Sequence, residues 1–190
     1  MISYIKRNKF LSFFVLLTIT SFISGIFFYT FIDNNTKNVI SNNINLLINN
    51  KLIKFNNLYL NNICITTLIW LLGISVIGIF IVIPLFLFKV FLFSFEFISL
   101  ISNLGLKNIF LILLYLFPNF MIVLICFIIC FYSGSYSLYL VRHLFKNINY
   151  NMSAITKKYI YIYFISIIIV LFSCLLESVI IPNLQLFLIK

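Results

Sequence analysis

Two acidic residues, Glu96 and Glu177, stand inside long apolar stretches of this sequence. A carboxyl group within an apolar membrane helix costs about 2.5 to 3.5 kcal/mol on insertion scales, so it marks either a structural hydrogen-bonding site or a path for protons or cations. A proton relay usually has several ionisable members, and the sequence shows no clear second one at the depth of Glu96. Structural hydrogen bonding to another helix is therefore the favoured interpretation of Glu96.

The basic residue nearest to Glu96 along the chain is Lys89. It precedes Glu96 by about two helical turns, so both side chains share one helix face while their backbones lie about 10.5 Å apart along the axis. We expect Lys89 to extend toward the cytoplasmic headgroups, which leaves Glu96 protonated or paired with another helix. Glu177 lies near the C-terminal end of its apolar stretch, which is expected to face outside. We hypothesise that Lys107 is its charge partner.

The other residues that are able to do chemistry form no constellation for catalysis. Four cysteines fall inside apolar stretches, without the C-x-x-C pairs of zinc or redox motifs: Cys64, Cys126, Cys130 and Cys174. We interpret them as small packing residues. His143 stands beside Arg142 with no Ser, Cys or acid next to it, so it makes no nucleophilic site and is interpreted as a cytoplasmic interface residue. We expect no metal, no cofactor and no enzymatic activity.

The composition indicates which elements must hold these side chains. Hydrophobic residues make up 64% of the chain and charged residues 8%, with a mean hydropathy of +1.20. Residues 55–88 and 108–141 contain no charged side chain at all. Because about 20 apolar residues suffice to cross a bilayer, the sequence predicts a multi-pass membrane protein with one membrane domain over residues 1–190.

We expect an all-α fold, because only helices and closed barrels satisfy the backbone in lipid and the alternating pattern of barrel strands is absent. The five predicted transmembrane helices are residues 10–32, 62–80, 84–103, 109–132 and 159–181. The first exceeds the apolar core of a signal peptide and ends without a small-residue cleavage site, so we expect a retained signal anchor. Ser21 and Gly25 within it form a small-xxx-small pair, which is typical of close helix packing.

Basic residues predict the orientation through the positive-inside rule. Those expected in the cytoplasm are Lys6, Arg7, Lys9, Arg142, Lys146, Lys157 and Lys158, and those expected outside are Lys37, Lys51, Lys54, Lys107 and Lys190. The N-terminus is then cytoplasmic and the C-terminus outside, with an outer loop at 33–61 and an inner basic loop at 133–158. The net charge of +10 is scattered over both sides, so we exclude nucleic-acid binding and expect contact with anionic lipid instead.

The outer loop contains an amphipathic pattern. Its apolar residues recur at helical spacing: Ile40, Ile44, Leu47, Ile48 and Leu52. One interpretation is an interfacial helix that lies on the outer leaflet, and the other is a docking helix for an extracellular protein.

Several short motifs follow one another in a fixed order along nearly the whole chain. They are Leu60-Asn61-Asn62, Trp70-Leu71-Leu72-Gly73 with Gly78, Lys89, Asn103-Leu104-Gly105-Leu106-Lys107, Pro118-Asn119, and Glu177 with Pro182. In order and spacing they resemble the stage II sporulation protein M family. The chain departs from the family pattern after Lys89, where Val90 and Ser94 stand in place of glycines, and Glu96 has no counterpart.

The resemblance implies a non-catalytic membrane scaffold in the machinery that remodels peptidoglycan while the mother cell engulfs the forespore. Its partners would be the stage II sporulation proteins D and P, which degrade the wall outside the membrane. The location would be the engulfing or septal membrane of an endospore-forming bacterium. Residues 39–55 are the expected contact region for these partners.

Transport is the alternative function. A proline-broken fourth helix at Pro118 and the intramembrane Glu96 are compatible with the permease subunit of a multi-component, ABC-type transporter. Such a subunit presents a cytoplasmic coupling helix to an ATPase, and residues 142–158 form the only inner loop long enough for one. A third interpretation is a protein that shapes the membrane.

Overall fold

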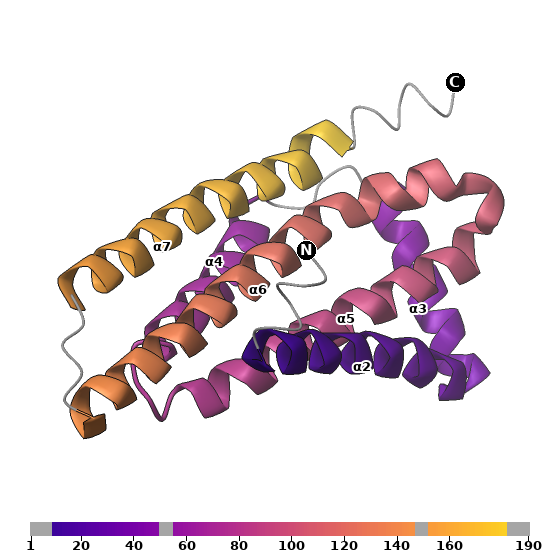
Figure 1. Ribbon diagram of the computed structural model, residues 1–190. Helices are drawn as coiled ribbons and strands as arrows, with labels where there is room; N and C mark the ends of the chain where they lie inside the picture. The colour runs from indigo at the N-terminus through magenta and orange to yellow at the C-terminus, as the bar shows by residue number, and fades with distance from the viewer. Residues whose placement is uncertain (1–8, 50–54, 147–151, 182–190) are drawn as a thin grey trace.

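The computed structural model describes residues 9–49, 55–146 and 152–181, and in these ranges helices joined by short turns make up the structure, with no strand (Figure 1). The helices are α2 (Lys9–Phe31), α3 (Asn34–Asn49), α4 (Phe55–Leu72), α5 (Ile79–Leu104), η1 (Leu106–Asn108), α6 (Ile109–Lys146), α7 (Met152–Leu175) and the π-helical η2 (Leu176–Ile180). The predicted all-α class is confirmed for the described part of the chain.

Four helices in these ranges are long and apolar enough to cross a membrane. Their apolar stretches lie in α2, in α5, in η1 with α6, and in α7 with η2. The apolar part of α4, Tyr59–Leu72, is shorter. Large apolar side chains remain exposed on the outer faces of the bundle, with Phe31 at 84% and Phe80 at 76%. A soluble protein rarely exposes so much contiguous apolar surface, and in a bilayer these side chains contact lipid.

The helix boundaries differ from the predicted spans in two places. The second and third spans were predicted as 62–80 and 84–103, but α4 ends at Leu72 and α5 begins at Ile79, so Pro84 lies inside α5 and not at its start. The predicted inner loop, 133–158, is largely helical, since α6 continues to Lys146 and α7 begins at Met152. The first difference arises because turn residues between α4 and α5, and not hydropathy, decide where these helices end.

A tight turn joins α4 to α5. The Ser75 hydroxyl accepts a hydrogen bond from the Gly78 backbone N–H at 2.8 Å, and the Ser75 N–H donates to the Leu72 carbonyl at 3.2 Å. A Cβ on Gly78 would lie 1.8 Å from that same carbonyl oxygen. Only glycine fits there, so the motif glycine fixes the point at which the chain reverses.

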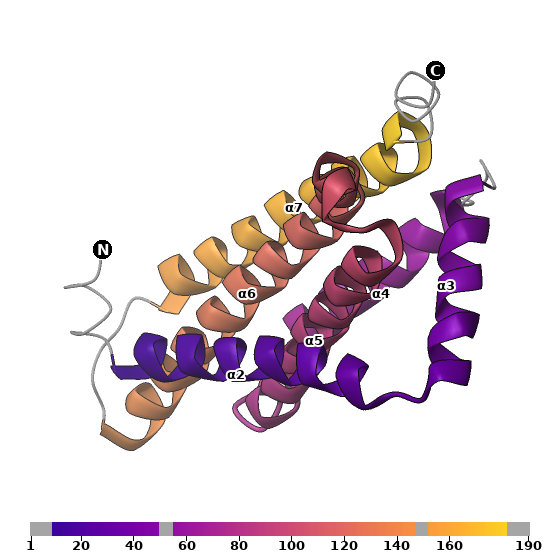
Figure 2. The ribbon, with the colours of Figure 1, turned by 90° about the vertical axis from the view of Figure 1, so that its right-hand side faces the viewer.

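In the bundle α2 packs on α5, α5 on α6 and α6 on α7, and α4 packs on α7 and also contacts α6 and α5. Figure 1 shows α5 and α6 as an antiparallel hairpin, with the α4–α5 turn at one end of the bundle and the α5–α6 turn at the other. In Figure 2, α3 stands at the second end, nearly perpendicular to α2. We call the end with the α4–α5 turn the turn end, and the end with the α5–α6 turn and α3 the α3 end.

Small residues bring α2 and α5 together. The Ser21 hydroxyl donates to the Leu87 carbonyl at 2.6 Å, and a Cβ on Gly25 would lie 1.9 Å from the Ser94 Oγ and 2.5 Å from the Phe91 carbonyl oxygen. The predicted close packing at Ser21 and Gly25 is confirmed. Ser94, which stands where the resembled family has glycine, packs closely because the glycine of this contact lies on α2.

At the α3 end, Gly105 closes α5 with φ at 72° and ψ at 156°, a conformation that is essentially reserved for glycine. Asn103 fixes α3 to α5, because its side chain accepts a hydrogen bond from the Ser41 hydroxyl at 2.6 Å and donates to the Ser41 carbonyl at 3.2 Å. Ile44 of α3 packs against the small core formed by Leu100, Ile112 and Leu116. The amphipathic helix is therefore docked on its own bundle.

Candidate functional site

Polar side chains from four helices meet inside the apolar bundle. We call this group the polar cluster: Asn62 of α4, Lys89 and Glu96 of α5, Asn119 of α6, Cys174 of α7 and Glu177 of η2. Asn62 is buried, and its Oδ1 accepts a hydrogen bond from the Lys89 ammonium at 3.3 Å. Its Nδ2 contacts the Cys174 sulfur at 3.8 Å. One amide thus connects α4 to both α5 and α7.

Glu96 is held by the amide of Asn119. The Asn119 Nδ2 lies 2.9 Å from one carboxylate oxygen and 3.1 Å from the other, so the amide donates to both. Asn119 follows Pro118, whose missing N–H interrupts the hydrogen-bond ladder of α6. The Ser173 hydroxyl of α7 donates to the Pro118 carbonyl at 2.7 Å, which fixes α7 beside this point. The predicted hydrogen bonding of Glu96 to another helix is confirmed.

Glu177 faces the same cluster from η2, which directly follows α7. Its charge interacts with those of Glu96 and Lys89. Its Oε2 atom and the Ser178 hydroxyl are both buried and have no hydrogen-bond partner within the described residues. Glu177 lies in the π-helical turn η2, a rare geometry that occurs frequently at functional sites.

This arrangement corrects three expectations from the sequence. Lys89 does not extend to the headgroups but donates to Asn62 within the bundle. Glu177 faces Lys89 and not Lys107, which is exposed on η1. Glu96 also has a second acid near it, because the packing of the helices brings Glu177 of η2 within electrostatic reach. The sequence analysis placed these residues by their positions along single helices, and it missed these contacts because they are made between helices.

The formal charges in the cluster do not cancel. Lys89 contributes one positive charge, and Glu96 and Glu177 contribute two negative charges when both are ionised. An uncompensated charge in a membrane helix is expensive, at about 2.5 to 3.5 kcal/mol on insertion scales. The cluster therefore favours the addition of one positive charge.

A second polar contact lies at the turn end. We call it the aromatic–serine contact: Trp70, Gly73, Ser133, Tyr159 and Tyr163. The Trp70 ring stacks with those of Tyr163 and Tyr159, at centroid distances of 4.2 Å and 5.7 Å. The Tyr159 hydroxyl donates to the Trp70 carbonyl at 2.8 Å, and the Ser133 hydroxyl donates to the Gly73 carbonyl at 3.3 Å. All of these groups are uncharged, so this contact is structural.

The motif residues thus fall into separate places. Lys89, Glu96, Asn119 and Glu177 come together, whereas Trp70 and Gly73 lie at the turn end and Gly105 at the α3 end. Asn61 is exposed, and its neighbour Asn62 is the residue that enters the cluster. Pro182 and Leu52 lie outside the described residues, and of Leu47 and Ile48 only the backbone is described.

Sequence reasoning missed three members of these contacts: Asn62 as a cluster residue, Ser173 and Cys174. Each is a polar or small residue inside an apolar run, which is a signal for packing between helices but does not identify the partner. Within the described ranges, no group of three His, Cys, Asp or Glu side chains is placed to hold a metal ion.

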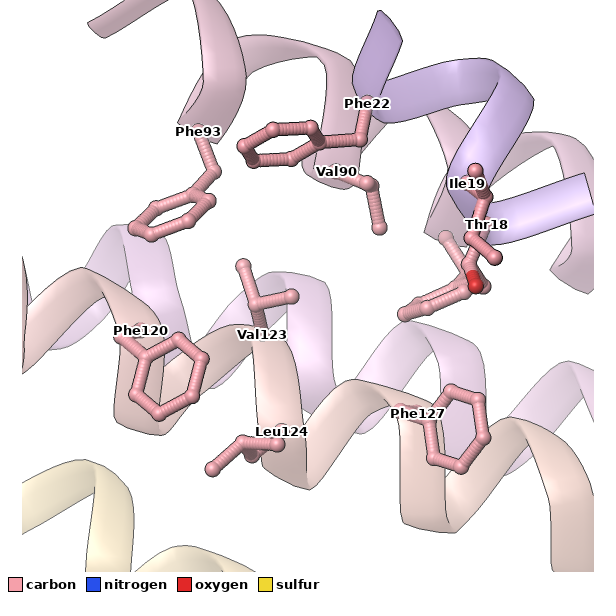
Figure 3. A pocket seen from close by; sticks show the side chains of 10 residues that line it. Thr18, Ile19, Phe22, Val90, Phe93, Phe120, Val123, Leu124 and Phe127 are labelled. Atoms are coloured by element: carbon pink, nitrogen blue, oxygen red, sulfur yellow. The ribbon is translucent and has the colours of Figure 1, made fainter. Parts of the chain in front are cut away.

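An apolar cavity of about 290 Å³ lies between α2, α5 and α6 (Figure 3). Phenylalanines such as Phe22, Phe93 and Phe120 line it, and its one polar side chain, Thr18, donates to the Val15 carbonyl of its own helix at 2.7 Å. A ligand site needs a few polar groups that fix orientation. The cavity offers none, so the polar cluster remains the candidate site.

Comparison of the chain with known protein families, with curated proteins and with solved structures gives no match. The class that composition and fold define is that of a multi-pass, all-α membrane protein.

Proposed function

We propose that the chain is a non-catalytic membrane scaffold that positions peptidoglycan-degrading enzymes, the stage II sporulation proteins D and P, during forespore engulfment. One observation carries this proposal. Lys89, Asn119 and Glu177, which were singled out by their resemblance to the stage II sporulation protein M family, come from three different helices and meet in one cluster. The convergence gives these residues a common place in the fold, as residues of one shared motif set would have.

The packing residues of the resemblance support the same proposal. Gly73 and Gly78 have neighbours that leave no room for a Cβ, and Gly105 has a backbone conformation that glycine alone adopts readily. These three motif glycines therefore have a physical role in this fold.

In the proposed orientation, the turn end faces the cytoplasm and the α3 end faces outside. The exposed Lys157 and the neighbouring Lys158 then lie in the cytoplasm, and the Lys158 ammonium lies 5.1 Å from the centre of the Tyr132 ring. On the opposite side, Lys37 donates to the Thr30 carbonyl at 3.2 Å, near the end of α2. The last described residues of α7 lie toward the α3 end (Figure 1).

The outer helix α3 is the proposed contact surface. Val39 is 58% exposed, and Asn42 and Asn43 are exposed beside it, whereas Ile44 is turned toward the bundle. The two hydrogen bonds between Ser41 and Asn103 hold the helix in place. A hydrolase that binds this surface would gain a high effective concentration at the wall without any added chemistry.

The transporter alternative is less well supported. A coupling helix was expected within residues 142–158, but α6 extends to Lys146 and α7 starts at Met152. The polar cluster also lies toward the α3 end and not beside this connection.

Photocrosslinking in sporulating cells tests the scaffold directly. A photoreactive residue at the exposed Val39 should capture a peptidoglycan hydrolase, whereas the same residue at Ile44 should crosslink within the chain, because Ile44 faces α5 and α6. Capture of an ATPase from position 157, without a hydrolase at position 39, would contradict the scaffold and support a transporter.

Deletion of the gene gives a second test. The scaffold predicts that proteins D and P lose their localisation and engulfment fails, while the purified enzymes cut wall fragments equally well with or without this protein. Direct stimulation of wall cleavage by the purified protein in solution would contradict a purely positional role.

A further inference from the structure

The polar cluster has more carboxylates than cations. Its charged groups are Lys89 and Glu96 of α5 and Glu177 of η2, and the thiols of Cys126 and Cys174 face the same group. No other ionisable side chain of the described residues acts on Glu96 or Glu177. The cluster therefore carries one excess negative charge when both acids are ionised.

We propose that this cluster is a proton-binding site within the membrane, where Glu96 and Glu177 together hold one exchangeable proton beside Lys89. Binding converts one carboxylate and one proton from water into a carboxyl group. The formal charge of the cluster then changes from −1 to zero. No oxidant, metal or other reactant takes part.

The geometry gives each acid a reason to hold the proton or to release it. Both oxygens of Glu96 accept hydrogen bonds from Asn119, and such donors stabilise the ionised form, whereas the burial of Glu96 opposes it. The Oε2 of Glu177 is buried without a donor, so nothing replaces the water that an ionised oxygen would bind. The two acids therefore share the proton, and Lys89 balances the charge that remains.

The position of Glu177 also provides a way for the proton to exchange. It lies in the π-helical turn at the end of the apolar stretch Ser153–Val179, so it is close to the α3 end of the bundle. Lys89 lies deeper, near the middle of α5, and is fixed by Asn62. Exchange from the α3 end therefore needs only a local opening of η2.

Infrared spectroscopy tests this proposal by counting protonated carboxyl groups. The chain is well suited to it, because it contains only three acidic residues and the third, Asp33, is exposed. The protein is placed in bilayers of ether-linked lipid, which lack ester carbonyl bands. We expect one protonated carboxyl per chain at neutral pH, and loss of its band as the pH rises.

Three variants distinguish charge balance from a merely buried acid. In Glu177→Gln and in Glu96→Gln, the remaining acid balances Lys89, so the band at neutral pH should disappear. In Lys89→Met, both acids should be protonated and the band should double. Both glutamine variants keep the side-chain shape, and circular dichroism checks that they fold.

Three results would overturn the proposal. The first is the absence of a protonated carboxyl band in the unmodified protein at neutral pH. The second is a band that persists in both glutamine variants. The third is a band that falls when sodium replaces potassium at constant pH, because a metal cation would then supply the missing positive charge. The test does not depend on the scaffold function, since it uses the purified protein alone.

Discussion

The polar cluster and the aromatic–serine contact connect the same helices, α4, α6 and α7, by different means. At the turn end, the hydroxyls of Tyr159 and Ser133 donate to backbone carbonyls, and every partner is neutral. In the polar cluster, the contacts run between side chains and include three groups that can carry charge. One end of the bundle is held by shape and the other by charge.

This difference follows from what drives association in lipid. Helices gain little from the hydrophobic effect there, so they associate through small residues that allow close approach or through polar side chains that bond across the interface. The aromatic–serine contact uses the first method together with hydroxyls, and the polar cluster uses the second. The turn end should therefore respond to volume changes, and the cluster to charge and pH.

The largest expected effect comes from Lys89→Met, which removes the only cation of the polar cluster. Both acids must then take up a proton, and the free energy of unfolding at neutral pH should fall by about 3 kcal/mol, the loss typical of a buried ionic group that loses its partner. Chemical unfolding in detergent micelles measures this change.

The exposed Lys107 provides the control for that variant, since Lys107→Met should leave stability nearly unchanged. Adding Glu96→Gln to Lys89→Met should restore most of the lost stability. If the double variant is no more stable than Lys89→Met, charge does not hold this end together.

Gly73→Ala tests the shape-dependent end. A Cβ at this position would lie 2.3 Å from the Ser133 Oγ and 2.4 Å from the Tyr159 hydroxyl oxygen. We expect a loss of about 2 kcal/mol from overpacking, independent of pH. Thermal unfolding at two pH values measures both aspects.

A compensating change sharpens this prediction. Ser133→Gly removes the closest atoms and should recover part of the stability of Gly73→Ala. The matched control is Ile74→Val at the neighbouring exposed position, which should have little effect. A strong pH dependence of Gly73→Ala would contradict the distinction between the two ends.

Asn119→Leu should have a smaller effect, because it removes the donor to Glu96 but no charge. We expect a cost of about 1 kcal/mol, at the low end for an unsatisfied buried group, since the carboxyl can take up a proton instead. Unfolding measured as a function of pH should show this cost growing as the pH rises. An equal cost at all pH values would mean that Glu96 is not ionised in the native protein.

The smallest effect is expected at Asp33, which precedes α3. Hydrogen bonds from the Thr36 hydroxyl and backbone amides lower the pKa of Asp33 below its ordinary value of 3.8. A lowered pKa means that the ionised form stabilises the fold, so this contribution is present above the unfolded pKa and is lost as the pH falls through the folded pKa.

Hydrogen exchange of the α3 amides measures the Asp33 effect. Protection should decrease at acidic pH in the unmodified chain, whereas Asp33→Asn should keep the helix cap and lose the pH dependence. An identical acid response in both proteins would show that the cap does not depend on the charge.

The sequence by itself determined the class of the protein. The uncharged stretches require helices, because lipid leaves no alternative for the backbone, and they placed α2 to within one residue at each end. Spacing also identified the contact at Ser21 and Gly25 as a close approach, and it identified Glu96 as a hydrogen-bonding acid. These are properties of single helices, which periodicity and composition describe well.

Only the tertiary structure decided which polar residues meet. Lys89 and Glu96 belong to one helix, and Glu177 lies far away in the sequence, yet the packing of α7 and η2 beside α5 and α6 places its charge near theirs. The sequence also could not decide whether the apolar face of α3 contacts lipid, a partner protein or the bundle itself. In the structure this helix packs on Asn103 and on the core around Leu100. The physical reason is that an apolar helix of nearly uniform hydrophobicity has no preferred neighbour until small residues and polar groups on several helices are matched in space.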